Sequence, residues 1–263
     1  MAVARRLILV TAVALCAACA CGAPPVVRVG SKNFTEQEIL AELVAQLLER
    51  VEGVRVERRF GLGGTDICHA ALLSDQLDVY VEYTGTGLVN VLRRNVVGSG
   101  ASVHRLVARE YRDRYELEWL APIGFNNTYA IAVRAERAEE MGWRTVSDLR
   151  ANAGELRAGF TSEFIERPDG YPGLRDAYGM AFGSVMDLDP GLMYGAIARG
   201  QVDVICAFAT DGRIEEHALR TLRDDLGFFP PYDAAPVVRG ELLAARPALR
   251  DALAPLAGAI SDG

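Results

Sequence analysis

Apolar residues in the first third of the chain alternate between strand spacing and helix spacing. Residues 26–30 form a short β-rich run, and Thr35 and Glu38 fit a capping box that opens a helix. The apolar positions of that helix lie three and four residues apart, at Ile39, Leu40, Leu43, Val44, Leu47 and Leu48. Alternation over residues 54–60 predicts a second strand.

A glycine-rich turn leads to the next helix and strand. Gly61-Leu62-Gly63-Gly64 lacks the lysine of a P-loop and the glycine spacing of a dinucleotide fingerprint, so we interpret it as a tight strand-to-helix turn. Thr65 or Asp66 is expected to cap the helix that follows, and residues 77–83 are predicted to form a strand.

The middle of the chain repeats this order of elements. Strands are predicted over residues 129–133 and 202–208. Between them, Ser147 is expected to cap a short helix, and Asp189-Pro190 is expected to open a second helix that runs to Gly200. Strands that alternate with helices predict an α/β fold with mainly parallel pairing.

Two of the predicted strands repeat one another in sequence. Residues 76–83 are Gln-Leu-Asp-Val-Tyr-Val-Glu-Tyr, and residues 201–208 are Gln-Val-Asp-Val-Ile-Cys-Ala-Phe. Both segments end on an aromatic residue and continue into a loop with threonine and glycine. Either two unrelated units share a short consensus, or the chain has two equivalent lobes. In the second interpretation, each lobe places an aromatic ring at the carboxyl end of a strand, where open α/β sheets bind ligands.

The N-terminus has the features of an export signal. Arg5 and Arg6 precede an apolar run over residues 7–20, which is too short to span a bilayer comfortably. Small residues and cysteines follow, as at the end of a bacterial lipoprotein signal. We therefore predict a signal over residues 1–21 with lipidation at Cys21 or Cys19. A plain secretory signal and an uncleaved anchor are the alternatives.

The composition excludes several kinds of site. A net charge of −7 disfavours binding to nucleic acid. We interpret Cys68 and Cys206 as buried thiols, with a disulfide between them as the alternative. His69, His104 and His217 show no metal-ligand spacing, so we expect neither a metal site nor another cofactor.

Aromatic residues beside turn-forming segments are the strongest candidates for function. They are Tyr83, Tyr129, Phe208 and Tyr232. A single ring in such a position usually packs in the core or at its rim. Rings that converge from separate segments form a cage for a trimethylammonium group, worth about 0.5–2 kcal/mol per ring. Hydrogen bonding cannot replace such a cage, because a quaternary ammonium has no N–H group.

Several motifs occur together and in order between residues 26 and 260. They are Gly30-Ser31-Lys32-Asn33-Phe34-Thr35-Glu36-Gln37, Gly61-Leu62-Gly63-Gly64-Thr65-Asp66, Tyr80-Val81-Glu82-Tyr83-Thr84-Gly85-Thr86, Asn126-Asn127-Thr128-Tyr129-Ala130, Pro190-Gly191-Leu192-Met193-Tyr194, Thr210-Asp211-Gly212-Arg213 and Phe229-Pro230-Pro231-Tyr232. The set resembles the substrate-binding proteins of osmoprotectant ABC importers, which bind glycine betaine, proline betaine, choline or carnitine.

The resemblance implies a type II periplasmic-binding fold, in which two lobes close on the ligand like a hinged trap. We expect a first lobe over residues 26–126 and a second over residues 127–232. Residues 233–263 are expected to return to the first lobe, with a shorter C-terminus than in relatives.

The resemblance also implies the residues of the site. Its cage positions fall on the aromatic residues Tyr83, Tyr129, Phe208 and Tyr232. Lys32, Thr86 and Arg167 fall where relatives hold a ligand carboxylate or line the cleft, although both cations would otherwise be interpreted as surface charges. Since Arg167 can bind a carboxylate through two parallel hydrogen bonds, we predict tighter binding of a betaine than of choline.

Three positions depart from the pattern of the relatives. Phe208 stands where some have tyrosine, Asn127 stands where some have aspartate, and Ser162 replaces a usual proline. The cleft is therefore expected to be more apolar and less charged than in some relatives.

These features favour a non-enzymatic, extracytoplasmic binding protein, lipid-anchored at the cell membrane or periplasmic. It would deliver its ligand to an ABC permease with a separate ATPase. The alternative is a ligand-sensing or orphan binding protein of the same fold. An enzyme on this fold is a third possibility, but no Gly-x-Ser-x-Gly elbow or cysteine nucleophile motif supports it.

Overall fold

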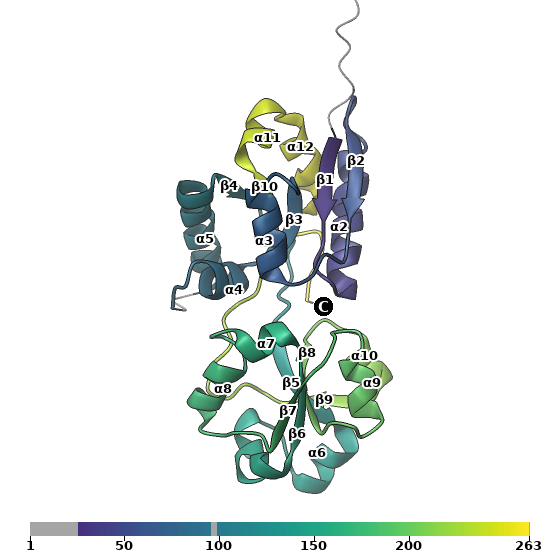
Figure 1. Cartoon of the computed structure of the whole chain (residues 1–263), viewed down its shortest axis with the longest axis vertical. Coiled ribbons are helices and arrows are strands. Elements are labelled where there is room, and N and C mark those ends of the chain that lie inside the picture. Colours follow the sequence, from purple (N-terminus) through teal and green to yellow (C-terminus); the bar gives the residue numbers. More distant parts are fainter. Residues whose placement is uncertain (1–25, 96–98, 263) are drawn as a thin grey trace, which may run out of the picture.

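The structure is a computed structural model that describes residues 26–95 and 99–262. These residues form two lobes, each built on a five-stranded sheet flanked by helices (Figure 1). The two-lobed α/β fold predicted from the sequence is therefore confirmed. The predicted signal over residues 1–21, with Cys19 and Cys21, lies outside the described residues.

The sheet of the first lobe has the strand order β2-β1-β3-β10-β4. Its strands are β1 (Val26–Gly30), β2 (Arg55–Arg59), β3 (Val79–Tyr83), β4 (Leu117–Trp119) and β10 (Ala234–Arg239). Strand β1 pairs in parallel with β2 and β3, whereas β10 runs antiparallel to β3 and β4.

The sheet of the second lobe has the equivalent order β7-β6-β8-β5-β9. Its strands are β5 (Tyr129–Arg134), β6 (Arg157–Phe160), β7 (Ser184–Asp187), β8 (Val204–Phe208) and β9 (Leu219–Thr221). Strand β6 is parallel to β7 and β8, and β5 is antiparallel to β8 and β9. The expected mainly parallel pairing is wrong, because β5 and β10 each enter their sheet directly from the other lobe.

Helices cover the faces of both sheets. Those of the first lobe are α2 (Thr35–Leu48), α3 (Thr65–Leu73), α4 (Thr84–Thr86), η1 (Gly87–Val91), α5 (Gly100–Tyr115), α11 (Gly240–Ala245), α12 (Ala248–Leu253) and η4 (Ala254–Leu256). Those of the second are α6 (Ala135–Met141), η2 (Val146–Ala151), η3 (Ala153–Glu155), α7 (Ser162–Glu166), α8 (Tyr171–Tyr178), α9 (Met193–Ala198) and α10 (Arg213–Glu216). No helix in residues 26–95 or 99–262 has the length and apolar character needed to cross a membrane.

Helix α2 forms where the apolar spacing predicted it, but it starts differently. Leu40, Val44 and Leu48 are buried in the core. The predicted capping box is wrong, because Phe34 is the N-cap residue and Thr35 already lies in the helix. The extended backbone of Phe34 directs its ring away from the helix and toward the second lobe.

Two other predicted caps are wrong for a similar reason. Gly64 is the N-cap residue of α3, so Thr65 lies in the first turn of the helix and its hydroxyl group is free to face the other lobe. Thr145, not Ser147, caps the next short helix and forms a capping box with Asp148.

The start of α9 lies further along the chain than predicted. The Asp189 carboxylate accepts a hydrogen bond from the Gly191 N–H at 2.7 Å and closes a turn. The helix therefore begins only at Met193. This turn leaves Pro190 at the edge of the cleft.

The internal sequence repeat corresponds to β3 and β8, the central strands of the two sheets. At the start of each repeat, an aspartate accepts hydrogen bonds from an arginine of the neighbouring parallel strand. Asp78 binds the backbone N–H and Nε of Arg28 at 2.7 and 2.9 Å. Asp203 binds the same groups of Arg157 at 3.0 and 2.9 Å. The two lobes are thus built alike.

The chain crosses between the lobes twice, before β5 and before β10. The two crossing segments run antiparallel, with a bridge between Asn126 and Asp233. The Asn127 N–H donates to the Tyr232 carbonyl at 3.1 Å, and the Tyr232 N–H donates to Asn126 Oδ1 at 2.6 Å. The paired crossing segments connect the two lobes.

Candidate ligand-binding site

A cavity of about 470 Å³ lies between the lobes, at the carboxyl ends of β3 and β8. The structure brings together at this cavity every residue predicted to bind a ligand. These are Lys32, Tyr83, Thr86, Asn127, Tyr129, Arg167, Phe208 and Tyr232. They come from strand ends, from the loop before α2, from α4, from the end of α7 and from both crossing segments.

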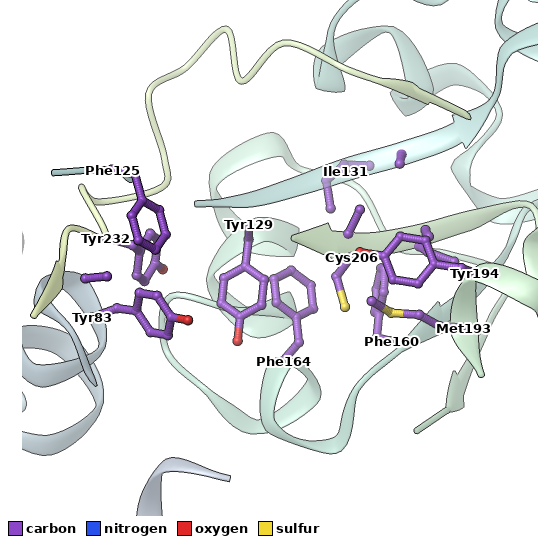
Figure 2. Packing of buried hydrophobic residues seen from close by; sticks show 14 of the residues in the cluster. Tyr83, Phe125, Tyr129, Ile131, Phe160, Phe164, Met193, Tyr194, Cys206 and Tyr232 are labelled. Atoms are coloured by element: carbon purple, nitrogen blue, oxygen red, sulfur yellow. The ribbon is translucent and has the colours of Figure 1, made fainter. Parts of the chain in front are cut away.

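The aromatic side chains form a continuous arc along the cavity wall. The Tyr129 ring lies 5.7 Å from both Tyr232 and Phe208, edge-on to the first and tilted to the second. Phe34, which was not among the predicted site residues, stacks on Phe208 at 4.7 Å and on Tyr83 at 6.3 Å. Figure 2 shows Tyr83, Tyr129 and Tyr232 gathered near the crossing segments.

The three tyrosines of this arc are buried at 2–8% exposure, and burial favours the neutral form of their hydroxyl groups. Burial raises the pKa of each phenol well above its usual value. Tyr232 donates its proton to Asp169 Oδ2 at 2.6 Å, and Tyr83 donates to a carboxylate oxygen of Glu36. These bonds fix the orientation of two rings whose faces line the cavity.

Lys32 enters the cavity already paired with an acidic side chain. It is 2% exposed, and its Nζ donates to Glu82 Oε1 at 2.6 Å and to Thr65 Oγ1 at 2.8 Å. The ammonium group also lies 5.3 Å from the centre of the Tyr83 ring.

Arg167 is paired as well. Its Nε and Nη2 bind the two oxygens of Asp169, and its Nη1 binds Glu163 Oε1 at 2.9 Å. The guanidinium carbon lies 5.5 Å from the Tyr129 ring and 6.0 Å from the Tyr232 ring. Because Arg167 is only 3% exposed, these partners replace most of its hydration.

Glu163 connects the two cations and the two lobes. Its Oε1 accepts a hydrogen bond from the Thr65 hydroxyl at 2.5 Å, which joins α7 of the second lobe to α3 of the first. Burial opposes ionisation of this carboxyl, but the charges of Lys32 and Arg167 outweigh it and lower its pKa to about 2. A ligand carboxylate at this place would have to join or displace the Glu163 carboxylate.

Thr86 and Asn127 complete the polar wall. Thr86 is 2% exposed and lies in α4, directly after the Tyr83 strand. The Asn127 amide donates to Glu36 Oε1 at 2.8 Å, while its own Oδ1 is buried without a hydrogen-bond partner in the described part of the chain. Asn127 therefore keeps one unused acceptor beside the cavity.

The residues that the sequence interpretation missed are mostly the partners of those it found. They are Phe34, Glu36, Thr65, Glu82, Glu163 and Asp169. Phe34, Glu36 and Glu82 stand inside motifs that were already identified, so position in a motif was the available signal. Nothing in the pattern shows that Glu163 faces Thr65, because 98 residues separate them in sequence.

Comparison with known proteins agrees with this geometry. Residues 25–263 match the family described as the substrate binding domain of ABC-type glycine betaine transport systems. The chain is 35% identical over 237 residues to a carnitine transport binding protein of Listeria monocytogenes, covering 89% of this chain and 77% of the relative. It is 37% identical to a glycine-betaine-binding protein of Pseudomonas aeruginosa, covering 89% and 78% of the two chains.

Solved structures give the same result. A protein described as a glycine betaine/carnitine/choline ABC transporter superposes with a TM-score of 0.70 at 32% identity, covering 90% of this chain and 87% of that one. Ligand-free YehZ of Escherichia coli superposes with a TM-score of 0.60 at 32% identity, covering 89% and 88%. The chain therefore belongs to the family of substrate-binding domains of ABC-type glycine betaine transport systems.

Proposed function

We propose that the cavity between the lobes captures a small quaternary-ammonium osmoprotectant of the glycine betaine type for delivery to an ABC permease. The observation that carries this proposal is the arc of five aromatic rings around one cavity, at Phe34, Tyr83, Tyr129, Phe208 and Tyr232. Ring faces attract a cation that has no N–H group to donate.

We place the carboxylate of such a ligand beside Lys32, Thr86 and Arg167. The two cations are already paired with protein carboxylates, so a ligand carboxylate competes with Glu163 for Arg167. Betaine is still expected to bind more tightly than choline, since Lys32 and Arg167 both line the cavity.

A thermal-shift screen of glycine betaine, proline betaine, carnitine and choline tests the class of ligand. A compound that binds only the folded state at 100 times its Kd adds about 2.7 kcal/mol of stability. Calorimetry then ranks the compounds. No shift with any quaternary ammonium would refute the proposed class, and tighter binding of choline would refute the betaine preference alone.

We further propose that residues 26–126 and 233–263 form the first lobe and residues 127–232 the second. The boundaries rest on the paired crossing segments, where Asn127 follows Asn126 and Tyr232 precedes Asp233. The proposal predicts that a flexible joint lies at these residues, and hydrogen exchange with and without ligand would locate it.

We also propose that the protein is anchored to the membrane by a lipid on Cys21 or Cys19, and that it works without catalysis. Mass spectrometry of the membrane-bound form, together with Cys19→Ser and Cys21→Ser, identifies the modified residue. Uptake of labelled betaine in a strain without the gene separates import from ligand sensing, since unchanged uptake would refute the role in import.

A further inference from the structure

The first turn of α2 reaches across the cavity to the second lobe. Phe34 stacks on Phe208, and two residues later the Glu36 carboxylate accepts a hydrogen bond from the Thr210 hydroxyl. Thr210 lies 174 residues away in sequence, just after β8. Glu36 is therefore a bridge between the two lobes, separate from the Thr65–Glu163 contact on α3 and α7.

Glu36 collects donors from three parts of the molecule. Its Oε1 accepts from the hydroxyl of Tyr83 in the first lobe and from the amide of Asn127 in a crossing segment, and its Oε2 accepts from Thr210 in the second lobe. All three donors are uncharged. Glu36 thus has no ion-pair partner among these contacts, and it lies next to a tyrosine whose ring lines the cavity.

The loop that carries Thr210 is itself held firmly. Arg213 binds both oxygens of Asp211 and lies 4.2 Å from the centre of the Tyr194 ring. The hydroxyl of Tyr194 in turn accepts a hydrogen bond from the backbone N–H of Phe208 at 3.0 Å. These contacts brace the segment that carries both Phe208 and Thr210, so a bond from Thr210 to Glu36 also acts on the position of Phe208.

From this arrangement we propose that Glu36 is a positioning residue that locks the closed state around the ligand. It holds the Tyr83 ring through the phenol and pulls the Phe208 side of the cavity shut through Thr210. A ligand can enter the open cleft without this bond, but it leaves only after the bond breaks. The lock therefore acts on the dissociation rate. The inference rests on the proposed function only for its ligand measurement.

Thr210→Val tests the lock, because it removes the hydroxyl and keeps the shape of the side chain. Losing one hydrogen bond to a charged group should raise the dissociation rate of radiolabelled glycine betaine roughly tenfold. Glu36→Ala should raise it at least as much. Thr210→Ser keeps a hydroxyl group at this position, so its dissociation rate should stay as slow as that of the wild-type protein.

Glu38→Gln is the matched control, because Glu38 is an exposed carboxylate on the same helix. It should leave the dissociation rate unchanged. Urea unfolding of Thr210→Val checks that the fold is intact. A dissociation rate within twofold of the wild-type rate in both Thr210→Val and Glu36→Ala would overturn the inference.

Small-angle scattering of the ligand-free protein separates this inference from the proposed function. The lock predicts a larger radius of gyration for Thr210→Val than for the wild-type protein. If the wild-type protein binds no quaternary ammonium, the proposed function fails. The radii of gyration of the two ligand-free proteins still test whether the Thr210–Glu36 bond holds the lobes together. Identical radii would then overturn the lock as well.

Discussion

Arg167 is buried among acidic side chains, so it contributes to the fold as well as to the candidate site. Its guanidinium binds Asp169 through two bonds and Glu163 through one, and it lies against two tyrosine rings. Removing one partner of a buried ion pair costs more than the pair itself contributes, because the other charge stays buried and unpaired.

Arg167→Ala is therefore expected to lower the free energy of unfolding by about 3–5 kcal/mol. The buried Asp169 carboxylate would lose its counter-charge. Urea denaturation without ligand measures this effect. Arg175→Ala is the control, because Arg175 is exposed and, among the residues that the structure describes, forms an ion pair only with its neighbour Asp176, so its effect should stay within about 0.5 kcal/mol. An unchanged stability of Arg167→Ala would contradict the structural role.

Phe208 offers a more direct test of the aromatic arc than Arg167 does. It is only half-buried, and a phenyl ring has no polar group whose loss would leave a buried partner unpaired. Phe208→Leu keeps an apolar side chain but removes the ring face. Binding of a quaternary ammonium should weaken by about 0.5–2 kcal/mol, or roughly 2- to 30-fold, in calorimetry. Phe228→Leu, a half-buried ring outside the cavity, should leave the affinity unchanged. Equal affinities for all three proteins would remove Phe208 from the cage.

At this scale the sequence predicts which residues line the cavity better than it predicts their partners. Tyr83 and Phe208 could be found because each ends a repeated strand. Lys32 and Arg167 were identified, but their pairing with Glu82, Asp169 and Glu163 was not. A pairing between distant residues depends on how two lobes approach each other, and periodicity carries no information about that approach.

Among the helices, α3 combines a cavity-lining end with a buried face. Thr65 and Asp66 at its start line the cavity, while His69 one turn later packs edge-on against Tyr111 at 5.5 Å and Tyr115 at 4.9 Å. Burial lowers the pKa of His69, and the nearby Asp66 opposes this shift only partly. The folded state therefore binds a proton at His69 less readily than the unfolded state does.

Stability should consequently decrease as the pH falls below the ordinary imidazole pKa of 6.5. In this range native His69 binds a proton less readily than His69 of the unfolded chain does. The loss has an upper limit of about 1.4 kcal/mol per pH unit. Urea unfolding at pH 7.5 and pH 5.5 measures it. His69→Gln should reduce the difference in stability between the two pH values. An equal pH effect in wild type and His69→Gln would contradict the assignment.

The sequence predicts whether a segment forms a helix or a strand better than it predicts the residues at which that element begins and ends. The apolar spacing located α2, because one buried face fixes a helical period, whereas mostly apolar runs located β3 and β8, which are buried on both faces. The caps expected at Thr35, Thr65 and Ser147 were wrong, because Phe34, Gly64 and Thr145 take the N-cap positions. The Thr65 hydroxyl instead binds the side chain of Glu163 in the other lobe.

The whole molecule consists of two similar lobes that share one large hydrophobic cluster. Residues from both sheets belong to it, including Val29 and Val81 of the first and Val133 and Ile205 of the second. The chain also crosses between the lobes twice. We therefore expect the lobes to unfold together although each has a complete sheet of its own.

Two buried thiols, one in each lobe, can report on this cooperativity. Cys68 and Cys206 are unpaired, and burial raises the pKa of each thiol to about 12. In a protein with Cys16, Cys19 and Cys21 changed to serine, neither should react with a thiol reagent in the native state. Both should become reactive at the same urea concentration. Glu52→Cys, at an exposed position, provides the control that reacts at once. Separate midpoints for the two thiols would show independent lobes.

The position of the crossing segments has a mechanical consequence for capture. Asn127, Tyr129 and Tyr232 lie on or beside these segments, whereas Phe208 and Phe34 lie on the arms of opposite lobes. When two lobes open about a hinge, residues near the hinge move least, so we expect Tyr129 and Tyr232 to keep their places while Phe34 and Phe208 move apart. We expect an arriving cation to contact Tyr129 and Tyr232 first, and Phe34 and Phe208 to enclose it afterward.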